Sequence, residues 1–245
     1  MNRAPSGRYY NVCKSRESGA PVRKLLNKVL SRVGYELVKI DEFEKRLNWL
    51  LRQGVKFVQV GANDGVRFDS LYSKVTAHRC AGLVIEPLPD LFARLKANYA
   101  DYPSVVAVNK AIHSGAQRMT MYRASQRAVD SLAEWMSGIA SFDRRHLVKH
   151  GVPESHIIEE SVECDSLMNI LESKSFLDAN VLQVDVEGYD AEIIGGIDFS
   201  RFKPRLLKYE HKNLAVESRN LTEQRLRSVG YKIWRGAEDT VAWLV

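Results

Sequence analysis

Short, mostly apolar runs alternate with amphipathic stretches along most of this chain, and this alternation limits the possible folds more than any other feature. The strand-like runs lie at 56–60, 82–85, 105–108, 181–186 and 206–210. Helical patterns lie between or after them, near 68–75, 90–98, 189–194 and 221–229. Strands that alternate with helices pair side by side in parallel, so the pattern predicts a parallel sheet covered by helices.

The last part of the chain predicts how this sheet is completed. Residues 231–234 and 240–244 are short strand-like segments that can pair as an antiparallel hairpin. Together with the five parallel strands they predict an α/β fold with a doubly wound, mostly parallel seven-stranded sheet of the Rossmann-like kind. Ligands of such sheets bind at the carboxyl ends of the strands.

Residues 114–180 interrupt the alternation, because 67 residues are many more than usually connect neighbouring units. We expect an insertion there that covers the substrate. Within it, residues 119–122 and 161–164 resemble short strands, and Asp165 is the expected cap of a helix that carries Leu167, Ile170 and Leu171.

An N-terminal helical extension is expected before the catalytic domain, which we place at 55–245. Within residues 1–54, a flexible tail should precede a basic amphipathic helix at 22–33, and a second helix should begin at Asp41 and end before Gly54. We expect this basic helix to make weak peripheral contact with the inner face of an anionic membrane. Such helices also dock onto their own domain.

Charge is concentrated in the same extension. The whole chain carries +6, residues 1–40 carry +7, and the remainder carries −1. A domain of nearly neutral charge argues against a nucleic-acid substrate, because phosphates are usually bound by a basic cleft.

The compartment is predicted from what the sequence lacks. It shows no secretion signal and no apolar run near the roughly 20 residues that cross a bilayer, so we expect a cytoplasmic protein. Cys13, Cys80 and Cys164 form no CxxC pair and are expected to be free thiols. Because the six histidines show no HExxH spacing, we expect no structural metal, while a hard cation held by carboxylates stays open.

A turn of small residues follows the first strand: Gly61, Ala62, Asn63, Asp64 and Gly65. Such a turn lets the backbone approach a ligand closely, but it lacks the GxGxxG spacing of a dinucleotide site, which disfavours NAD. Glu86 ends the second strand, 21 residues after Gly65, where its carboxylate can accept hydrogen bonds from ribose hydroxyls. Alone, Glu86 could be an ordinary surface carboxylate. Strand, turn and spacing together favour a nucleoside cofactor.

Four segments resemble the FkbM family of S-adenosylmethionine-dependent methyltransferases: 58–65, 82–87, 184–188, and Lys203-Pro204 leading to Glu210. They span about residues 55–245. The resemblance implies a class I methyltransferase fold and S-adenosyl-L-methionine as cofactor. It also implies O-methylation of a hydroxyl on a sugar, glycan or small metabolite. In that family the glycine turn holds the methionine part and the Glu-Pro acid holds the ribose, which implies Gly61, Gly65 and Glu86.

One position departs from the common pattern of class I methyltransferases. They usually carry Asp or Glu two residues before the first glycine, where this chain has Gln59. An amide forms hydrogen bonds but cannot neutralise the methionine ammonium, so we expect that contact to pass to Asp64.

Four residues at the ends of two later strands are candidates for the proton acceptor. Asp185 and Glu187 are two apart and should share one face if their strand continues, and Glu210 and His211 end the neighbouring strand. The resemblance favours Asp185 and Glu187, whereas the ordinary pKa of histidine, ~6.5, favours His211. The three carboxylates could alternatively hold Mg²⁺ or Ca²⁺, and Asp185 and Glu187 could merely cap the next helix.

The insertion contributes candidates for the acceptor site. Trp135, Met136 and Phe142 could form an acceptor pocket, and four basic residues could bind an anionic acceptor: Arg144, Arg145, Lys149 and His150. The alternatives are that the aromatic residues pack the insertion onto the domain and that the basic run is a solvated helix face.

Two other functions stay open. A nucleic-acid methyltransferase is disfavoured because the sequence has no Asp-Pro-Pro-Tyr-like motif and no Pro-Cys motif. A non-catalytic S-adenosylmethionine-binding or scaffold protein would retain Glu86 but would need no base.

Overall fold

The computed structural model describes residues 42–67, 69, 71–131 and 134–245. Contacts divide the chain into residues 1–44 and residues 45–245, and the fold below is that of the second unit. The expected tail, the basic helix at 22–33 with its membrane contact, and the cap Asp41 lie outside the described residues. Within the described part of the chain, no helix is both long enough and apolar enough to span a membrane.

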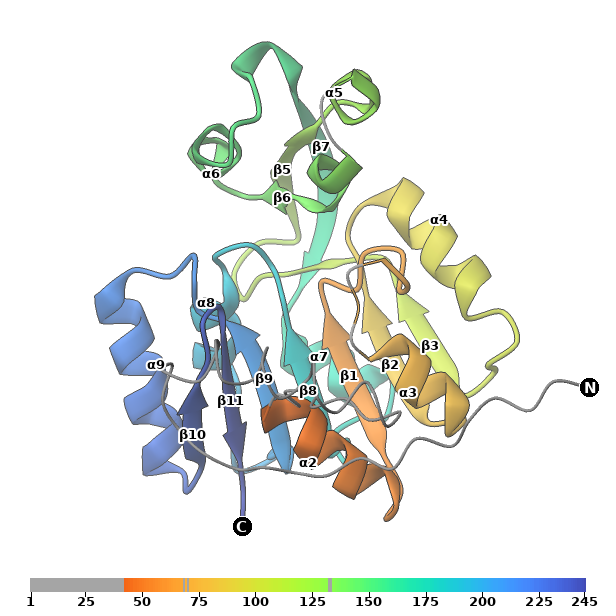
Figure 1. Cartoon of the computed structure of the whole chain (residues 1–245), viewed down its shortest axis with the longest axis vertical. Helices are drawn as coiled ribbons and strands as arrows, with labels where there is room; N and C mark the ends of the chain where they lie inside the picture. The colour runs from red at the N-terminus through yellow and green to blue at the C-terminus, as the bar shows by residue number, and fades with distance from the viewer. Residues whose placement is uncertain (1–41, 68, 70, 132–133) are drawn as a thin grey trace, which may run out of the picture. The chain divides into compact units, whose positions relative to one another are not determined.

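A seven-stranded sheet forms the centre of this unit (Figure 1). Its strands are β1 (Lys56–Val60), β2 (Ala81–Ile85), β3 (Val105–Val108), β8 (Val181–Val184), β9 (Leu206–Glu210), β10 (Lys232–Arg235) and β11 (Asp239–Trp243). The spatial order is β10-β11-β9-β8-β1-β2-β3, with β1, β2, β3, β8 and β9 parallel and β11 antiparallel to both of its neighbours. The predicted doubly wound, mostly parallel sheet is therefore confirmed.

Helices cover both faces of the sheet (Figure 1). They are α2 (Glu42–Leu51, of which residues 45–51 belong to this unit), α3 (Tyr72–Ala77), α4 (Pro89–Asn98), α7 (Leu167–Ser173), α8 (Asp190–Gly195) and α9 (Val216–Ser228). Side chains alternate along each strand, so Val58 and Val60 face the apolar core built with α7, α8 and α9. Phe57 and Gln59 point to the opposite face, where α3 and α4 lie.

A second sheet of four strands is built almost entirely from the predicted insertion. Its strands are β4 (Ala111–Ile112), β5 (Arg118–Ala124), β6 (Ala140–Ser141) and β7 (Ile157–Asp165), in the order β4-β7-β5-β6. The short helices around it are α5 (Gln126–Ser131), η3 (Glu134–Gly138), α6 (Arg144–Lys149) and η4 (Glu154–His156). This layer has an apolar cluster of its own, which includes Met136, Ile139 and Leu147. In Figure 1 it lies beyond the carboxyl ends of the parallel strands.

Three helix starts differ from the predictions. Helix α9 begins at Val216, five residues before the predicted start near 221. The hydroxyl of Ser166, not Asp165, caps α7 by accepting a hydrogen bond from the amide of Asn169 at 3.1 Å. Asp165 instead accepts from the amide of Ser166 and pairs with Lys110. Helix α3 begins at Tyr72 rather than near residue 68, because the carboxylate of Asp69 accepts the amides that begin the helix.

Strand β8 ends at Val184, two residues earlier than predicted. Its partner β1 ends at Val60, and Gly61 then turns with a φ of +76°. The ladder consequently stops after the amide of Asp185 bonds to the carbonyl of Val60. Glu187 follows with a φ of +54°, so Asp185 and Glu187 do not share a strand face as expected.

Candidate functional site

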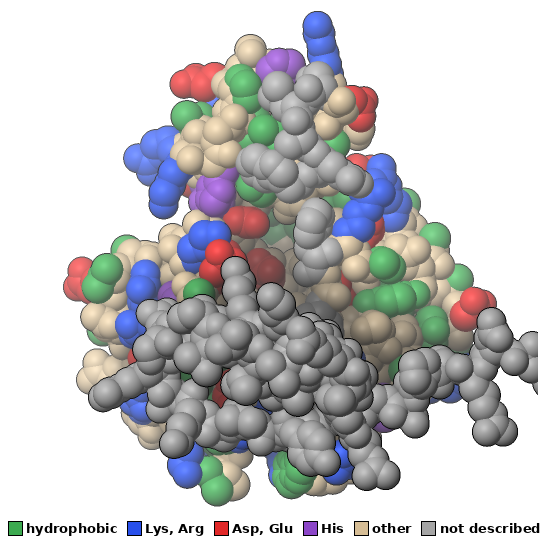
Figure 2. All heavy atoms as spheres, in the orientation of Figure 1, with side chains coloured by type: hydrophobic (Ala, Val, Ile, Leu, Met, Phe, Trp, Pro, Cys, Tyr) green, Lys and Arg blue, Asp and Glu red, His purple; other side chains and the backbone are tan. Residues whose placement is uncertain are grey.

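A pocket of about 310 Å³ opens at the carboxyl ends of β1, β2, β8 and β9, between the large sheet and the second sheet. This is the edge at which parallel α/β sheets bind ligands, and the volume suits a small molecule. The lining of the pocket comes from the glycine turn, the ends of the strands and residues 138–140 of the second sheet's layer. Figure 2 shows acidic and histidine side chains close together in the hollow between the two layers.

The glycine turn brings bare backbone to this pocket. Gly61, Ala62 and Asn63 line the pocket. A β-carbon on Gly61 would lie 1.8 Å from the carbonyl oxygen of Asp185, so no other residue fits there without a shift of the backbone. Gly65 has a φ of +79°, and a β-carbon there would lie 2.6 Å from the side chain of Leu95 in α4.

Glu86 lies buried at the end of β2 and also lines the pocket. One carboxylate oxygen accepts the amide of Asn63 and the other accepts the amide of Leu88, both at 2.9 Å. Burial raises the pKa of Glu86 to about 7, and the two amide hydrogen bonds oppose that shift. Glu86 therefore connects the glycine turn to the start of α4 beside the place expected for a ribose.

Gln59 and Gln183 are register partners on β1 and β8, and both are buried in the pocket lining. The Oε1 atom of each has no hydrogen-bond partner among the described residues. Buried acceptors of this kind are normally satisfied, so they suit a ligand that donates hydrogen bonds.

A carboxylate that the sequence analysis missed lies beside Gln59. Asp69 lines the pocket and hydrogen-bonds to Gln59, and burial raises its pKa. Asp64 does not take the expected place. Its carboxylate accepts the amides of Val66 and Arg67 within the turn and is not among the residues that line the pocket. An aspartate before a helix is visible in the sequence as a possible cap. Only the folded loop brings Asp69 close to Gln59.

Three carboxylates converge on the opposite side of the pocket: Asp185, Glu187 and Glu210. The side chain of Asp185 is accessible from the pocket, and protein surrounds it on its other sides. Burial, followed by repulsion from Glu210 and Glu187, raises its pKa to about 7. Burial and repulsion from Glu187 raise the pKa of Glu210 to about 6. The amide of Asn213 donates to Glu187 at 3.2 Å and to Glu210 at 2.8 Å, which fixes both side chains.

His211 does not join these carboxylates. Because it follows Glu210 directly, its side chain points the other way, and it is buried with its Nδ1 atom 2.9 Å from the hydroxyl of Thr240. Burial lowers its pKa, and it does not line the pocket. Of the four proton-acceptor candidates, the structure brings together the three carboxylates.

The insertion contributes less than expected to the main pocket. Met136 is buried in the insertion's own cluster, and the side chain of Trp135 lies outside the described residues. Phe142, Arg145 and Lys149 line a second cavity that adjoins the first, while Arg144 pairs with Glu154 on the surface. His150 alone of the proposed basic group reaches the main pocket.

The four segments of the resemblance thus meet around one pocket. A family model described as the methyltransferase FkbM domain matches residues 59–233. The chain belongs to the FkbM methyltransferase family. The family implies S-adenosylmethionine as the methyl donor of this FkbM methyltransferase, and the match covers the glycine turn, Glu86 and all three converging carboxylates.

Solved methyltransferase structures show a distant likeness to this FkbM chain. Methyltransferase FkbM from Methylobacillus flagellatus KT is 13% identical, with 78% of this chain and 43% of that chain covered and a TM-score of 0.46. The METTL16 MTase domain is 15% identical, with coverage of 94% and 82% and a TM-score of 0.43. The fibrillarin pre-rRNA processing protein of Methanococcus jannaschii is 12% identical, with coverage of 79% and 68% and a TM-score of 0.41. No curated protein matches this chain significantly.

Proposed function

We propose that this methyltransferase transfers a methyl group from S-adenosylmethionine to a hydroxyl of a sugar, a glycan or another small metabolite. One observation carries the proposal. A single pocket has the glycine turn and Glu86 on one side and the carboxylates of Asp185, Glu187 and Glu210 on the other. A nucleoside cofactor and a polar acceptor can therefore lie side by side.

The residues on the cofactor side fit S-adenosylmethionine. Gly61 lines the pocket as bare backbone, because the place of a side chain there is filled by the carbonyl of Asp185. Glu86 offers its carboxylate to the ribose hydroxyls. The unpaired Oε1 atoms of Gln59 and Gln183, with the carboxylate of Asp69 beside them, offer acceptors and a negative charge to the methionine ammonium. Bound there, the cofactor supplies an electrophilic methyl group on its sulfonium.

The acceptor side suits a molecule rich in hydroxyl groups. Asp185 lies directly behind Gly61 and opens into the pocket, so it is our candidate to take the proton of the hydroxyl that is methylated. Glu187, Glu210 and Asn213 offer further hydrogen-bond partners on the same side. Carboxylates would repel a phosphate backbone, and residues 41–245 carry a net charge of −1. Both features favour a small polar acceptor over a nucleic acid.

The test uses the full chain and radiolabelled S-adenosylmethionine with panels of nucleotide sugars, glycolipid precursors, small phenols and RNA. Labelled methyl ether on a sugar or other hydroxyl compound is the expected product. Label in RNA, or binding of the cofactor with no transfer to any compound, would contradict the proposal.

A further inference from the structure

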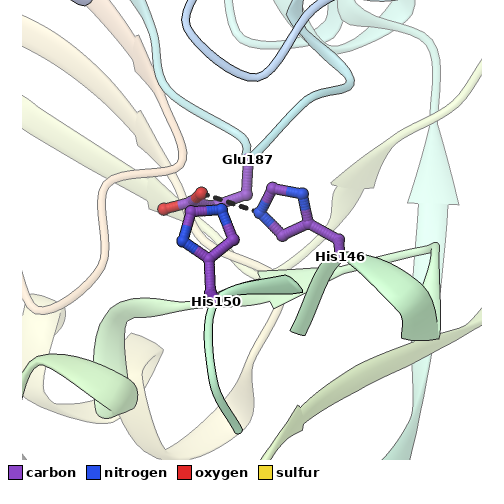
Figure 3. A group of neighbouring side chains, drawn as sticks. All are labelled: His146, His150 and Glu187. Atoms are coloured by element: carbon purple, nitrogen blue, oxygen red, sulfur yellow. Dashed lines mark hydrogen bonds and ion pairs between the residues drawn. The ribbon is translucent and has the colours of Figure 1, made fainter. Parts of the chain in front are cut away.

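Two histidines of the second sheet's layer meet one carboxylate of the large sheet's edge (Figure 3). His146 lies in α6 and His150 directly follows that helix, so their separation of four residues places both rings on one side, with centroids 4.5 Å apart. Glu187 reaches them from the turn after β8, and its Oε2 atom is 3.0 Å from Nε2 of His146. The three side chains come from two parts of the chain that the sequence does not place together.

The spacing of these side chains suits a metal ion. One ligand atom from each residue lies within 4.8 Å of the other two. Neighbouring ligand atoms around tetrahedral zinc are roughly 3.4 Å apart, as its bond lengths of ~2.0–2.2 Å require. The contact between His146 and Glu187 is already close to that value.

Asn213 holds this group in place from outside. Its amide nitrogen donates to Glu187 at 3.2 Å, and its Oδ1 atom is 3.3 Å from Nε2 of His150. Residues that hydrogen-bond to metal ligands commonly orient them in this way. The same amide also holds Glu210, so the ligands are part of a larger ordered network.

The charge around the group favours a cation. Asp185, Glu187 and Glu210 line one side of the main pocket, and their carboxylates would attract a divalent ion. Two imidazoles with one carboxylate are ligands that zinc and its neighbours in the first transition row prefer, whereas Mg²⁺ and Ca²⁺ prefer oxygen.

We propose that His146, His150 and Glu187 form a binding site for a divalent transition-metal ion of the zinc type. The proposal does not depend on methyl transfer, because it concerns binding of the ion alone. Three protein ligands leave a coordination position for water or another oxygen ligand. The site lies where the two cavities meet, since Glu187 and Asn213 line both.

The test uses the untagged full chain after removal of metal with a chelator. Zn²⁺ is titrated by calorimetry, and Co²⁺ is titrated by visible absorption. We expect one equivalent of Zn²⁺ to bind and Co²⁺ to give the intense spectrum of a low-coordinate site. His146→Ala, His150→Ala and Glu187→Gln should each weaken Zn²⁺ binding at least about tenfold, which is the lower end of the loss seen even for outer-shell partners.

His78→Ala is the matched control, because His78 is an exposed histidine at the end of α3 and should bind Zn²⁺ like the wild type. Circular dichroism of the metal-free proteins shows whether each variant folds. A second measurement needs no substitution, since Zn²⁺ should shift the ring resonances of two histidines in the wild-type spectrum. The proposal would be overturned if the wild type did not bind Zn²⁺. It would also be overturned if the three ligand variants bound Zn²⁺ as tightly as His78→Ala does. Binding of Mg²⁺ in place of Zn²⁺ would overturn it as well.

Discussion

The carbonyl oxygen of Asp185 occupies the space that a β-carbon on Gly61 would need, with only 1.8 Å between the two positions. The turn after β1 and the turn after β8 are therefore in direct backbone contact at the centre of the pocket. This contact places the proposed methionine-binding backbone immediately beside the proposed proton acceptor. A change at Gly61 should consequently affect both turns.

We expect Gly61→Ala to destabilise the protein by at least about 2 kcal/mol. The left-handed conformation costs a residue with a side chain about 1–2 kcal/mol, and overpacking adds about 1–3 kcal/mol. Gly230→Ala is the matched control, because Gly230 has a φ of +97° but open space around it. Urea denaturation of both variants measures the difference. Equal losses would show that the contact with Asp185 relaxes without cost.

Glu86→Gln should weaken binding of S-adenosylmethionine by roughly 10- to 150-fold, since losing a charge-assisted hydrogen bond costs about 1.5–3 kcal/mol. Calorimetry on the folded variant measures the loss. Glu217→Gln, which neutralises an exposed carboxylate in the first turn of α9, is the control and should bind normally. Unchanged affinity in Glu86→Gln would remove this residue from the cofactor site.

Glu86 should also make stability depend on pH. Burial raises its pKa from the ordinary value of 4.5 to about 7, so between these values the folded protein keeps a proton that the unfolded chain releases. Its contribution to stability is complete below pH 4.5 and is lost as the pH rises through 7, by up to about 3 kcal/mol. The difference between wild type and Glu86→Gln in urea denaturation, measured from pH 4.5 to 8, isolates this residue. The unfolding free energy of wild type minus that of Glu86→Gln should fall as the pH rises, and a value that stays constant or rises would contradict the assignment.

Asp69→Asn tests whether this carboxylate supplies the charge that Gln59 lacks. We expect this variant to bind S-adenosylhomocysteine, which carries the ammonium group, at least about tenfold more weakly than the wild type does. The reason is that a charge-assisted contact is lost. Adenosine lacks that group and should bind with unchanged affinity. Calorimetry with both ligands gives the comparison. Parallel losses for both ligands would indicate a general disturbance of the loop instead.

Asp185→Asn should abolish turnover at saturating cofactor while leaving cofactor affinity within a few fold, because it removes charge at the reacting side and leaves Glu86 intact. His211→Ala should affect stability more than turnover, because His211 is buried against Thr240 and does not line the pocket. Single-turnover assays with an identified acceptor, together with thermal melting, separate the two effects. Near-native turnover in Asp185→Asn with loss in His211→Ala would reverse this ranking.

Much of the fold could be predicted from residues close together in the sequence. The strands at 56–60, 105–108 and 206–210 have the predicted bounds, because each is a short apolar run between turn residues. The glycine turn and Glu86 were likewise visible from their place after successive strands. Helix starts were less predictable where two capping residues compete, as Asp165 and Ser166 do before α7.

The sequence by itself determined the parallel sheet and the edge at which the pocket opens, because these follow from local periodicity and turn chemistry. The family followed from four motifs that resemble its other members. Only the tertiary structure decided which side chains share that pocket. Strand β8 stops where its neighbour β1 stops, and this separates Asp185 from Glu187 and leaves both beside Glu210. His146 meets Glu187 across 41 residues of chain because the second sheet is placed beside that edge. Contacts of this range depend on how whole layers pack, and no local pattern of residues encodes them.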